Sequence, residues 1–119
     1  MFIPKNESDT EIRTNVRGGT GALPFRHILS QQQLAGRAEM IAEVTLLKGQ
    51  SVGVHPHTKN AELYYIISGK AVVTENGNEK ELSAGDAEFC ANGSEHSIEN
   101  RESAPCVFLA MILPDRSAK

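Results

Sequence analysis

Three of the four histidines lie in settings typical of metal ligands. His55 and His57 are separated by one residue, and on an extended strand this spacing places both imidazole rings on the same face. Glu62 follows a short polar turn and starts an otherwise apolar segment, so it could fold back beside the pair. His96 follows a glycine-containing turn, where another strand is expected to begin. Imidazoles together with one carboxylate suit Fe, Mn, Ni, Co, Cu or Zn.

Each of these residues also has a purely structural interpretation. His55 and His57 could be two exposed histidines at the rim of a sheet, and Glu62 alone could be a solvated acid at a strand end. His27 lies apart from the other three and shares the alternation of its apolar neighbours. This pattern favours His27 as a histidine of the core, or as one that hydrogen-bonds to a metal ligand, over His27 as a metal ligand itself.

The elements that must position these residues are short strands. Apolar and polar residues alternate from Met40 to Leu46, as in a half-buried strand. The other expected strands are Phe25–Leu29, Leu63–Ser68, Lys70–Thr74, Lys80–Leu82, Asp86–Cys90, His96–Glu99 and Pro105–Leu113. Asn76-Gly77 suits a type I′ turn and predicts a hairpin. Short strands separated by turns about every 8–12 residues indicate an all-β sandwich or barrel.

The N-terminal residues 1–24 contain proline and several glycines and show no sustained period, which predicts an irregular arm. We expect residues 25–119 to form a single β-barrel domain. Ser30 and Gln33 have the spacing of a capping box, so one short helical turn is expected there. The arm contains isolated apolar residues that could anchor it on a partner barrel, and these are Phe2, Ile3 and Ile12.

The composition narrows the class of protein. The chain has 119 residues and a net charge of −3 with no basic block, which argues against nucleic-acid binding. Its longest apolar run, Cys106–Leu113, falls far short of the about 20 residues that span a membrane. The N-terminus has no signal-peptide pattern, and Cys90 and Cys106 lack CxxC spacing. We therefore expect a cytoplasmic protein with two free thiols.

Two segments of the chain resemble the two motifs of the cupin family. The first is Gly49-(x)5-His55-x-His57-(x)4-Glu62-(x)6-Gly69, which matches at every defined position. The second is Gly85-(x)5-Ala91-x-Gly93-(x)2-His96-(x)3-Asn100, in which Ala91 stands where the family usually has proline. This proline stiffens the turn before the histidine, so its replacement affects the turn and removes no ligand. The two motifs are separated by 15 residues, as in small microbial cupins.

The resemblance implies a jelly-roll β-barrel, or double Greek key, with one divalent transition metal inside. It implies that the metal ligands are His55, His57, Glu62 and His96. It also implies one barrel per chain and a homodimer. Four protein ligands on an octahedral ion leave two positions for water, substrate or dioxygen.

The chemistry beyond the metal is less defined. Tyr64 shares the alternation of Glu62 and either points into the barrel or packs in the core. On the last strand, one of two apolar rows should line the pocket, and we expect Leu109 and Met111 to do so. Whether the protein is an enzyme stays open at this point. It is either a metalloenzyme of the dioxygenase, isomerase or decarboxylase type acting on a small molecule, or a metal-dependent module that binds or senses a small ligand.

Overall fold

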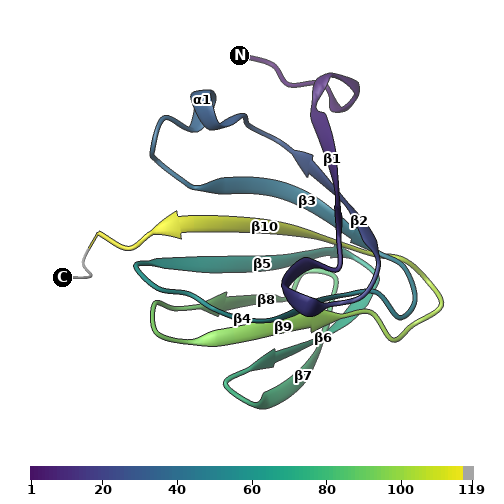
Figure 1. Cartoon of the computed structure of the whole chain (residues 1–119). Helices are drawn as coiled ribbons and strands as arrows, with labels where there is room; N and C mark the ends of the chain where they lie inside the picture. Colours follow the sequence, from purple (N-terminus) through teal and green to yellow (C-terminus); the bar gives the residue numbers. More distant parts are fainter. Residues whose placement is uncertain (117–119) are drawn as a thin grey trace.

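Two antiparallel sheets make up the computed structural model, which describes residues 1–116 (Figure 1). The strands are β1 (Asp9–Thr14), β2 (Ala22–His27), β3 (Met40–Leu46), β4 (Ser51–Pro56), β5 (Asn60–Ser68), β6 (Lys70–Glu75), β7 (Asn78–Ser83), β8 (Ala87–Cys90), β9 (Glu95–Glu99) and β10 (Cys106–Pro114). Three short helical turns complete the fold, and these are η1 (Lys5–Glu7), η2 (Val16–Gly18) and α1 (Gln31–Leu34). The predicted all-β class is confirmed.

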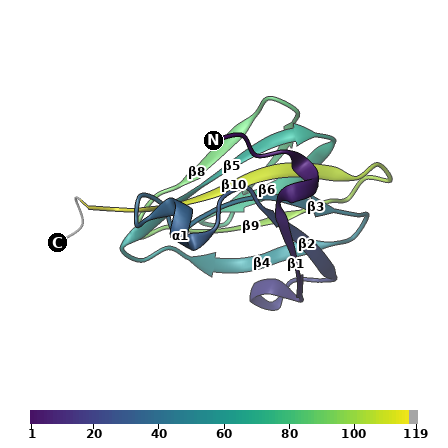
Figure 2. The ribbon, with the colours of Figure 1, turned by 90° about the horizontal axis from the view of Figure 1, so that it is seen from above.

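The strand orders are β1-β2-β3-β10-β5-β8 in the larger sheet and β4-β9-β6-β7 in the smaller one. Viewed from above, β1 and β8 lie at opposite edges of the larger sheet (Figure 2). Every second residue of β3 and of the first part of β10 is buried, because one face of each strand points at the other sheet. Tyr64, Phe108 and Ile98 are among the largest fully buried side chains of the core between the sheets.

Local sequence signals account for two of the connections. Asn76 and Gly77 both have positive φ, 49° and 83°, as a type I′ turn requires, and they join β6 to β7. Ser30 and Gln33 form the expected capping box, in which the Ser30 hydroxyl accepts from the Gln33 backbone N–H. Among residues 1–116, no helix is long and apolar enough to cross a membrane.

The N-terminal segment is more regular than an irregular arm. β1 pairs with β2 along its whole length, from Asp9 opposite His27 to Thr14 opposite Ala22. The strand is exposed almost throughout because it is the edge of the sheet, so it carries no apolar alternation that the sequence could reveal. The expected boundary at residue 24 falls inside β2.

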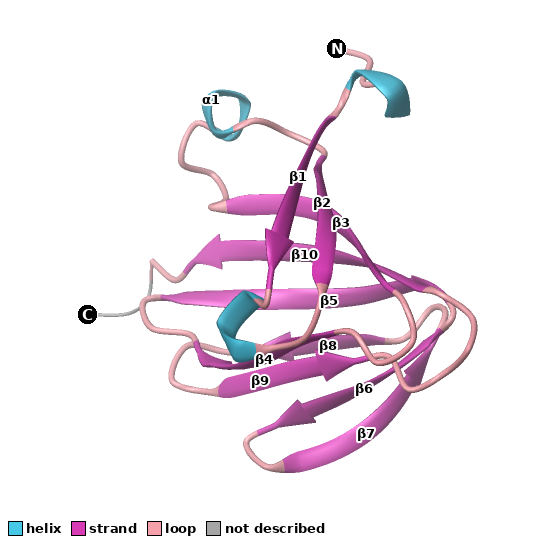
Figure 3. Cartoon of the chain, turned by 45° about the vertical axis from the view of Figure 1, so that its right-hand side comes forward, coloured by secondary structure: helices cyan, strands magenta, loops and turns pink. Residues whose placement is uncertain are grey.

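The turn η2 packs against β4 at an unusually close distance (Figure 3). A Cβ atom at Gly53 would collide with the backbone carbonyl oxygen of Arg17, and one at Gly19 would collide with that of Ser51. Glycine at both positions therefore lets the β1–β2 hairpin lie directly on the smaller sheet.

Candidate metal centre

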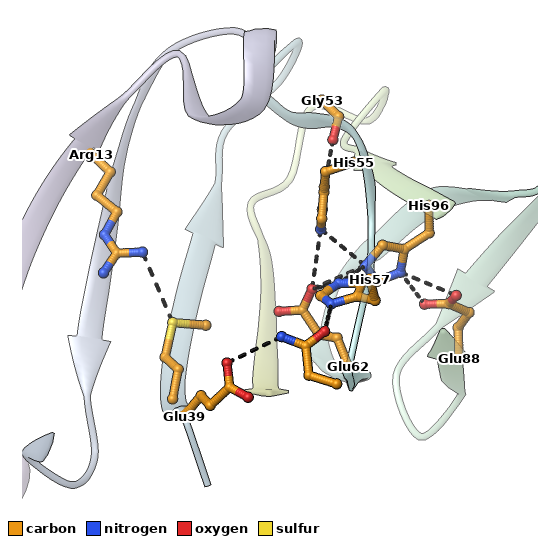
Figure 4. Close-up of polar contacts among 10 residues, drawn as sticks. Arg13, Glu39, Gly53, His55, His57, Glu62, Glu88 and His96 are labelled. Carbon is orange, nitrogen blue, oxygen red and sulfur yellow. Dashed lines mark hydrogen bonds and ion pairs between the residues drawn. The ribbon is translucent and has the colours of Figure 1, made fainter. Parts of the chain in front are cut away.

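Four buried side chains converge between the two sheets (Figure 4). His55 belongs to β4, His57 follows directly after β4, and His96 belongs to β9, where it is the register partner of His55. Glu62 comes from β5 in the other sheet. The structure thus brings together all four residues that the sequence motifs singled out, and each is at most 5% exposed.

The converging atoms are one carboxylate oxygen and three imidazole nitrogens. Glu62 Oε1 lies 3.2 Å from His55 Nε2 and 3.0 Å from both His57 Nε2 and His96 Nε2. His96 Nε2 lies 3.1 Å from His55 Nε2 and 3.2 Å from His57 Nε2. This cluster has the size and composition of a site for a single metal ion.

The outer nitrogens of His55 and His57 each face a hydrogen-bond acceptor. His55 Nδ1 lies 2.7 Å from the carbonyl oxygen of Gly53, and His57 Nδ1 lies 2.8 Å from Oδ1 of Asn60. The Asn60 amide is oriented by its own N–H, which donates to Glu39 Oε1 at 3.1 Å. Because both acceptors require an N–H at Nδ1, the neutral rings carry a lone pair at Nε2.

His96 follows the same arrangement with a charged acceptor. Its Nδ1 lies 2.8 Å and 3.1 Å from the two carboxylate oxygens of Glu88, on β8. When the three rings are neutral, three nitrogen lone pairs and the Glu62 oxygen therefore point at one another with no hydrogen between them. Such a set is repulsive unless a cation, either a proton or a metal ion, lies among the four atoms.

The charge states agree with this arrangement. Burial alone would raise the pKa of Glu62, but its close contacts with the rings of His55, His57 and His96 hold it well below its usual value. Burial alone would lower the pKa of His96, but its hydrogen bonds to Glu62 and Glu88 raise it to about 9. Glu62 is thus a carboxylate, and in the metal-free protein a proton on His96 takes the place of the cation near neutral pH.

A cavity of about 100 Å³ opens onto the cluster. Its walls are formed by His55, His57 and Glu62, by apolar side chains from both sheets, and by two arginines, Arg13 and Arg17. Pockets that hold drug-sized ligands typically measure about 300–1,000 Å³. The cavity therefore fits a ligand of only a few non-hydrogen atoms.

Tyr64 lines this cavity, as one interpretation of the sequence proposed. Its ring stacks on His96 with centroids 4.4 Å apart and planes 9° from parallel. Burial raises the pKa of the Tyr64 hydroxyl well above its usual value, with a smaller contribution from nearby carboxylates, so the phenol stays protonated. Tyr64 therefore forms part of the cavity wall and packs against the His96 ring.

The last strand presents the opposite row to the one expected. Phe108, Ala110 and Ile112 line the cavity, whereas Leu109 and Met111 lie on the outward face of β10 and are half-buried. Both rows of this strand are apolar, so the alternation identified two faces without indicating which one points inward. The placement of Leu109 and Met111 in the pocket was wrong.

His27 stays outside the cluster. Its Nε2 lies 2.9 Å from Glu11 Oε1, which links β2 to β1 near the surface. Sequence reasoning missed Glu88 and Asn60, which contact the outer nitrogens of His96 and His57. Glu88 did carry a signal, because it is a charged residue in a short strand and shares the alternation of the buried Cys90.

Taken together, two antiparallel sheets that bury three histidines and a glutamate define a small β-barrel protein with a candidate mononuclear metal centre. The family of cupin domains matches residues 42–112. An oxalate-binding protein from Thermotoga maritima is 37% identical over 113 residues, which are 95% of this chain and 93% of that protein. The chain therefore belongs to the cupin family.

Solved structures agree with this assignment. A crystal structure described as a predicted oxalate decarboxylase from Thermotoga maritima matches with a TM-score of 0.91 and 37% identity, over 96% of this chain and 99% of that one. The structure of KdgF from a Halomonas species matches with a TM-score of 0.75 over 98% of this chain and 97% of that one. Its identity is 19%, so this second match supports the fold alone.

Proposed function

We propose that the protein binds one divalent transition metal ion through His55, His57, Glu62 and His96. The observation that carries this proposal is the convergence of one carboxylate oxygen and three imidazole nitrogens, in rings whose other nitrogens point away from the centre towards hydrogen-bond acceptors. Three imidazoles and one carboxylate suit Fe, Mn, Ni, Co, Cu or Zn, and four protein donors leave room on such an ion for a further ligand. When bound, the ion supplies a Lewis acid that holds anionic oxygen atoms.

The ligand in this proposal is a small carboxylate, and oxalate is the first candidate. The small cavity beside the cluster supports a ligand of this size. The Thermotoga maritima relative, an oxalate-binding protein that is 37% identical to this chain, supports the choice of oxalate.

The cavity favours reversible binding over turnover. Apart from the proposed metal ligands, the ionisable side chains along its wall are Arg13, Arg17 and Tyr64. Arginine stays protonated in proteins, and the raised pKa of Tyr64 keeps its proton in place. Among residues 1–116, the side chains that line the cavity therefore include no general base besides the proposed metal ligands. The second candidate is metal-dependent turnover of the same ligand, which the description of the solved relative as a predicted oxalate decarboxylase favours.

Two measurements test the proposal. Elemental analysis of the purified protein should find about one transition metal per chain, and calorimetry should show oxalate binding to the metal-loaded protein but not to the metal-free protein. Protein that binds no transition metal, or that binds oxalate equally well without one, would show the proposal to be wrong. Release of formate, or consumption of dioxygen in the presence of oxalate, would establish turnover in place of binding.

A homodimer is part of the same proposal. Three large apolar side chains, Tyr65, Ile67 and Phe89, are exposed on the neighbouring strands β5 and β8, and the outward-facing Leu109 lies opposite Tyr65 on β10. Removal of such a surface from water contributes about 25 cal/mol per Å², which is partly offset by the entropy lost on association. Sedimentation of the unmodified protein and of Phe89→Glu should therefore show a dimer and a monomer, respectively.

The cellular location proposed is the cytoplasm. Cys90 and Cys106 are both buried and unpaired, which suits a reducing compartment. Fractionation of the source cells would test this location, since recovery of the chain outside the cytoplasm would contradict it.

A further inference from the structure

We propose that Arg13 and Arg17 bind the anionic end of the ligand that faces away from the metal, which makes the site selective for dianions over monoanions. The inference rests on the proposed function, because it assumes a carboxylate held at the four-residue cluster. Both arginines belong to the N-terminal hairpin, Arg13 to β1 and Arg17 to the turn η2 that follows it. Both line the cavity that opens onto the cluster.

The guanidinium of Arg13 has unused hydrogen-bond donors at the cavity wall. Its Nη2 pairs with Glu11 at 3.0 Å, and its Nη1 approaches the sulfur of Met40 at 4.0 Å, which is a weak acceptor. The guanidinium carbon lies 4.6 Å above the ring of Phe25. Met40 and Phe25 both line the cavity, so the group lies along the cavity wall. In the close-up, Arg13 extends from its own strand, apart from the cluster, towards the sulfur that it contacts (Figure 4). An arginine has five N–H donors, and these contacts use few of them.

Arg17 supplies a positive charge without a partner. Among residues 1–116, its guanidinium makes no hydrogen bond or ion pair. Its backbone is left-handed, with φ at 55°, and its carbonyl oxygen packs against Gly53 of β4. A non-glycine residue held in this region is conformationally costly and is found preferentially where a side chain must be placed for binding. The close packing on Gly53 therefore fixes the position from which Arg17 faces the cavity.

The net charge of the site, once metal and a dianion are bound, would favour positively charged side chains nearby. A divalent ion with Glu62 and three neutral imidazoles carries a net charge of about +1. A monoanion neutralises this charge, whereas a dianion leaves one negative charge in a cavity whose remaining wall is mostly apolar. Because Glu11 already offsets part of the charge of Arg13, Arg17 provides the compensation that a dianion needs. Guanidinium groups also match the two oxygens of a carboxylate with two parallel N–H donors.

The test compares Arg17→Gln and Arg13→Gln with the unmodified chain and with Arg37→Gln. Arg37 is exposed and lies outside the cavity wall, so its substitution makes the same change in net charge at another place. Zinc affinity, oxalate affinity of the zinc-loaded protein, and acetate affinity are measured for each variant by calorimetry. Arg13→Lys is added because Arg13 also contacts Glu11 and Phe25, and thermal unfolding reports any loss of stability.

We expect Arg17→Gln to lower oxalate affinity about tenfold, while zinc and acetate affinities change less than about twofold. Arg13→Gln should act in the same direction, and Arg13→Lys should recover part of the loss. Oxalate affinities of Arg13→Gln and Arg17→Gln equal to that of the unmodified protein would overturn this inference and leave the proposed function intact. An equal loss in Arg37→Gln would also overturn it, because the effect would then be one of net charge. Failure of the unmodified protein to bind zinc or oxalate would instead refute the proposed function.

Discussion

Replacing Glu88 by Gln should weaken metal binding although all four proposed ligands remain. Glu88 accepts the Nδ1 hydrogen of His96 with both carboxylate oxygens, at 2.8 Å and 3.1 Å, from a side chain that is 11% exposed. This acceptor keeps the His96 lone pair at Nε2, where the metal would bind, and its charge increases the basicity of the ring. Loss of such an outer partner typically lowers metal affinity by about 10–100-fold.

The size of the effect depends on pH, because a proton competes for the same nitrogen. Hydrogen bonds to Glu62 and Glu88 raise the pKa of His96 to about 9, against the opposing effect of burial, so the unmodified protein must release this proton when metal binds. Glu88→Gln lowers that pKa and so reduces the competition. The two effects partly cancel at pH 7, and the difference in affinity should increase from pH 7 towards pH 9.

Competition with a coloured zinc chelator at several pH values measures this difference. Glu95→Gln is the matched control, because Glu95 precedes His96 on β9, is exposed, and is absent from the hydrogen bonds of the cluster. An affinity of Glu88→Gln equal to that of the unmodified protein at pH 9 would refute the role assigned to Glu88. An equal loss in Glu95→Gln would attribute the effect to surface charge instead.

Three further outcomes follow from the site and from the hairpin beside it. His57→Ala should leave the far-UV spectrum of a folded barrel but lower zinc affinity at least about 100-fold, as elemental analysis and chelator competition would show. Zinc affinity of the unmodified protein should fall about tenfold for each pH unit below 9, because the pKa of His96 is raised to about 9 in the metal-free state and the proton must leave. Gly53→Ala should lower the free energy of unfolding in urea by about 1–3 kcal/mol, because its Cβ would collide with the Arg17 carbonyl oxygen.

The features that could be predicted from the sequence are those fixed by local chemistry. Alternation in residues 40–46 indicated a half-buried strand because one face of β3 packs in the core and the other does not. Asn76-Gly77 indicated a hairpin because both residues tolerate positive φ. The convergence of the three histidines and Glu62 was predicted from the resemblance of the two motifs to the cupin family. His55 lies near the C-terminal end of β4, whereas Glu62 and His96 lie near the N-terminal ends of β5 and β9.

The errors arise where a strand has two similar faces. β1 is exposed on nearly all of its residues, so it shows no alternation, and residues 9–14 appeared irregular. β10 is apolar on both faces, because Leu109 and Met111 on its outer face are as apolar as Phe108 and Ala110 on its inner face. Only the pairing of β10 with β3 and β5 in three dimensions determines which row faces the cavity.

One of the three acceptors behind the histidines depends on tertiary pairing, and it bears on how the site responds to pH. Gly53 offers a carbonyl oxygen and Asn60 an amide oxygen, both within three residues of the histidine they orient. Glu88 is eight residues before His96 and reaches it because β8 pairs with β5 beside the cluster. It is the charged acceptor of the three, so a residue outside the ligand set helps to raise the pKa of His96 and thereby sets the pH at which protons and metal compete. In the proposed site, a change on β8 would therefore adjust the metal affinity without any change in the four proposed ligands.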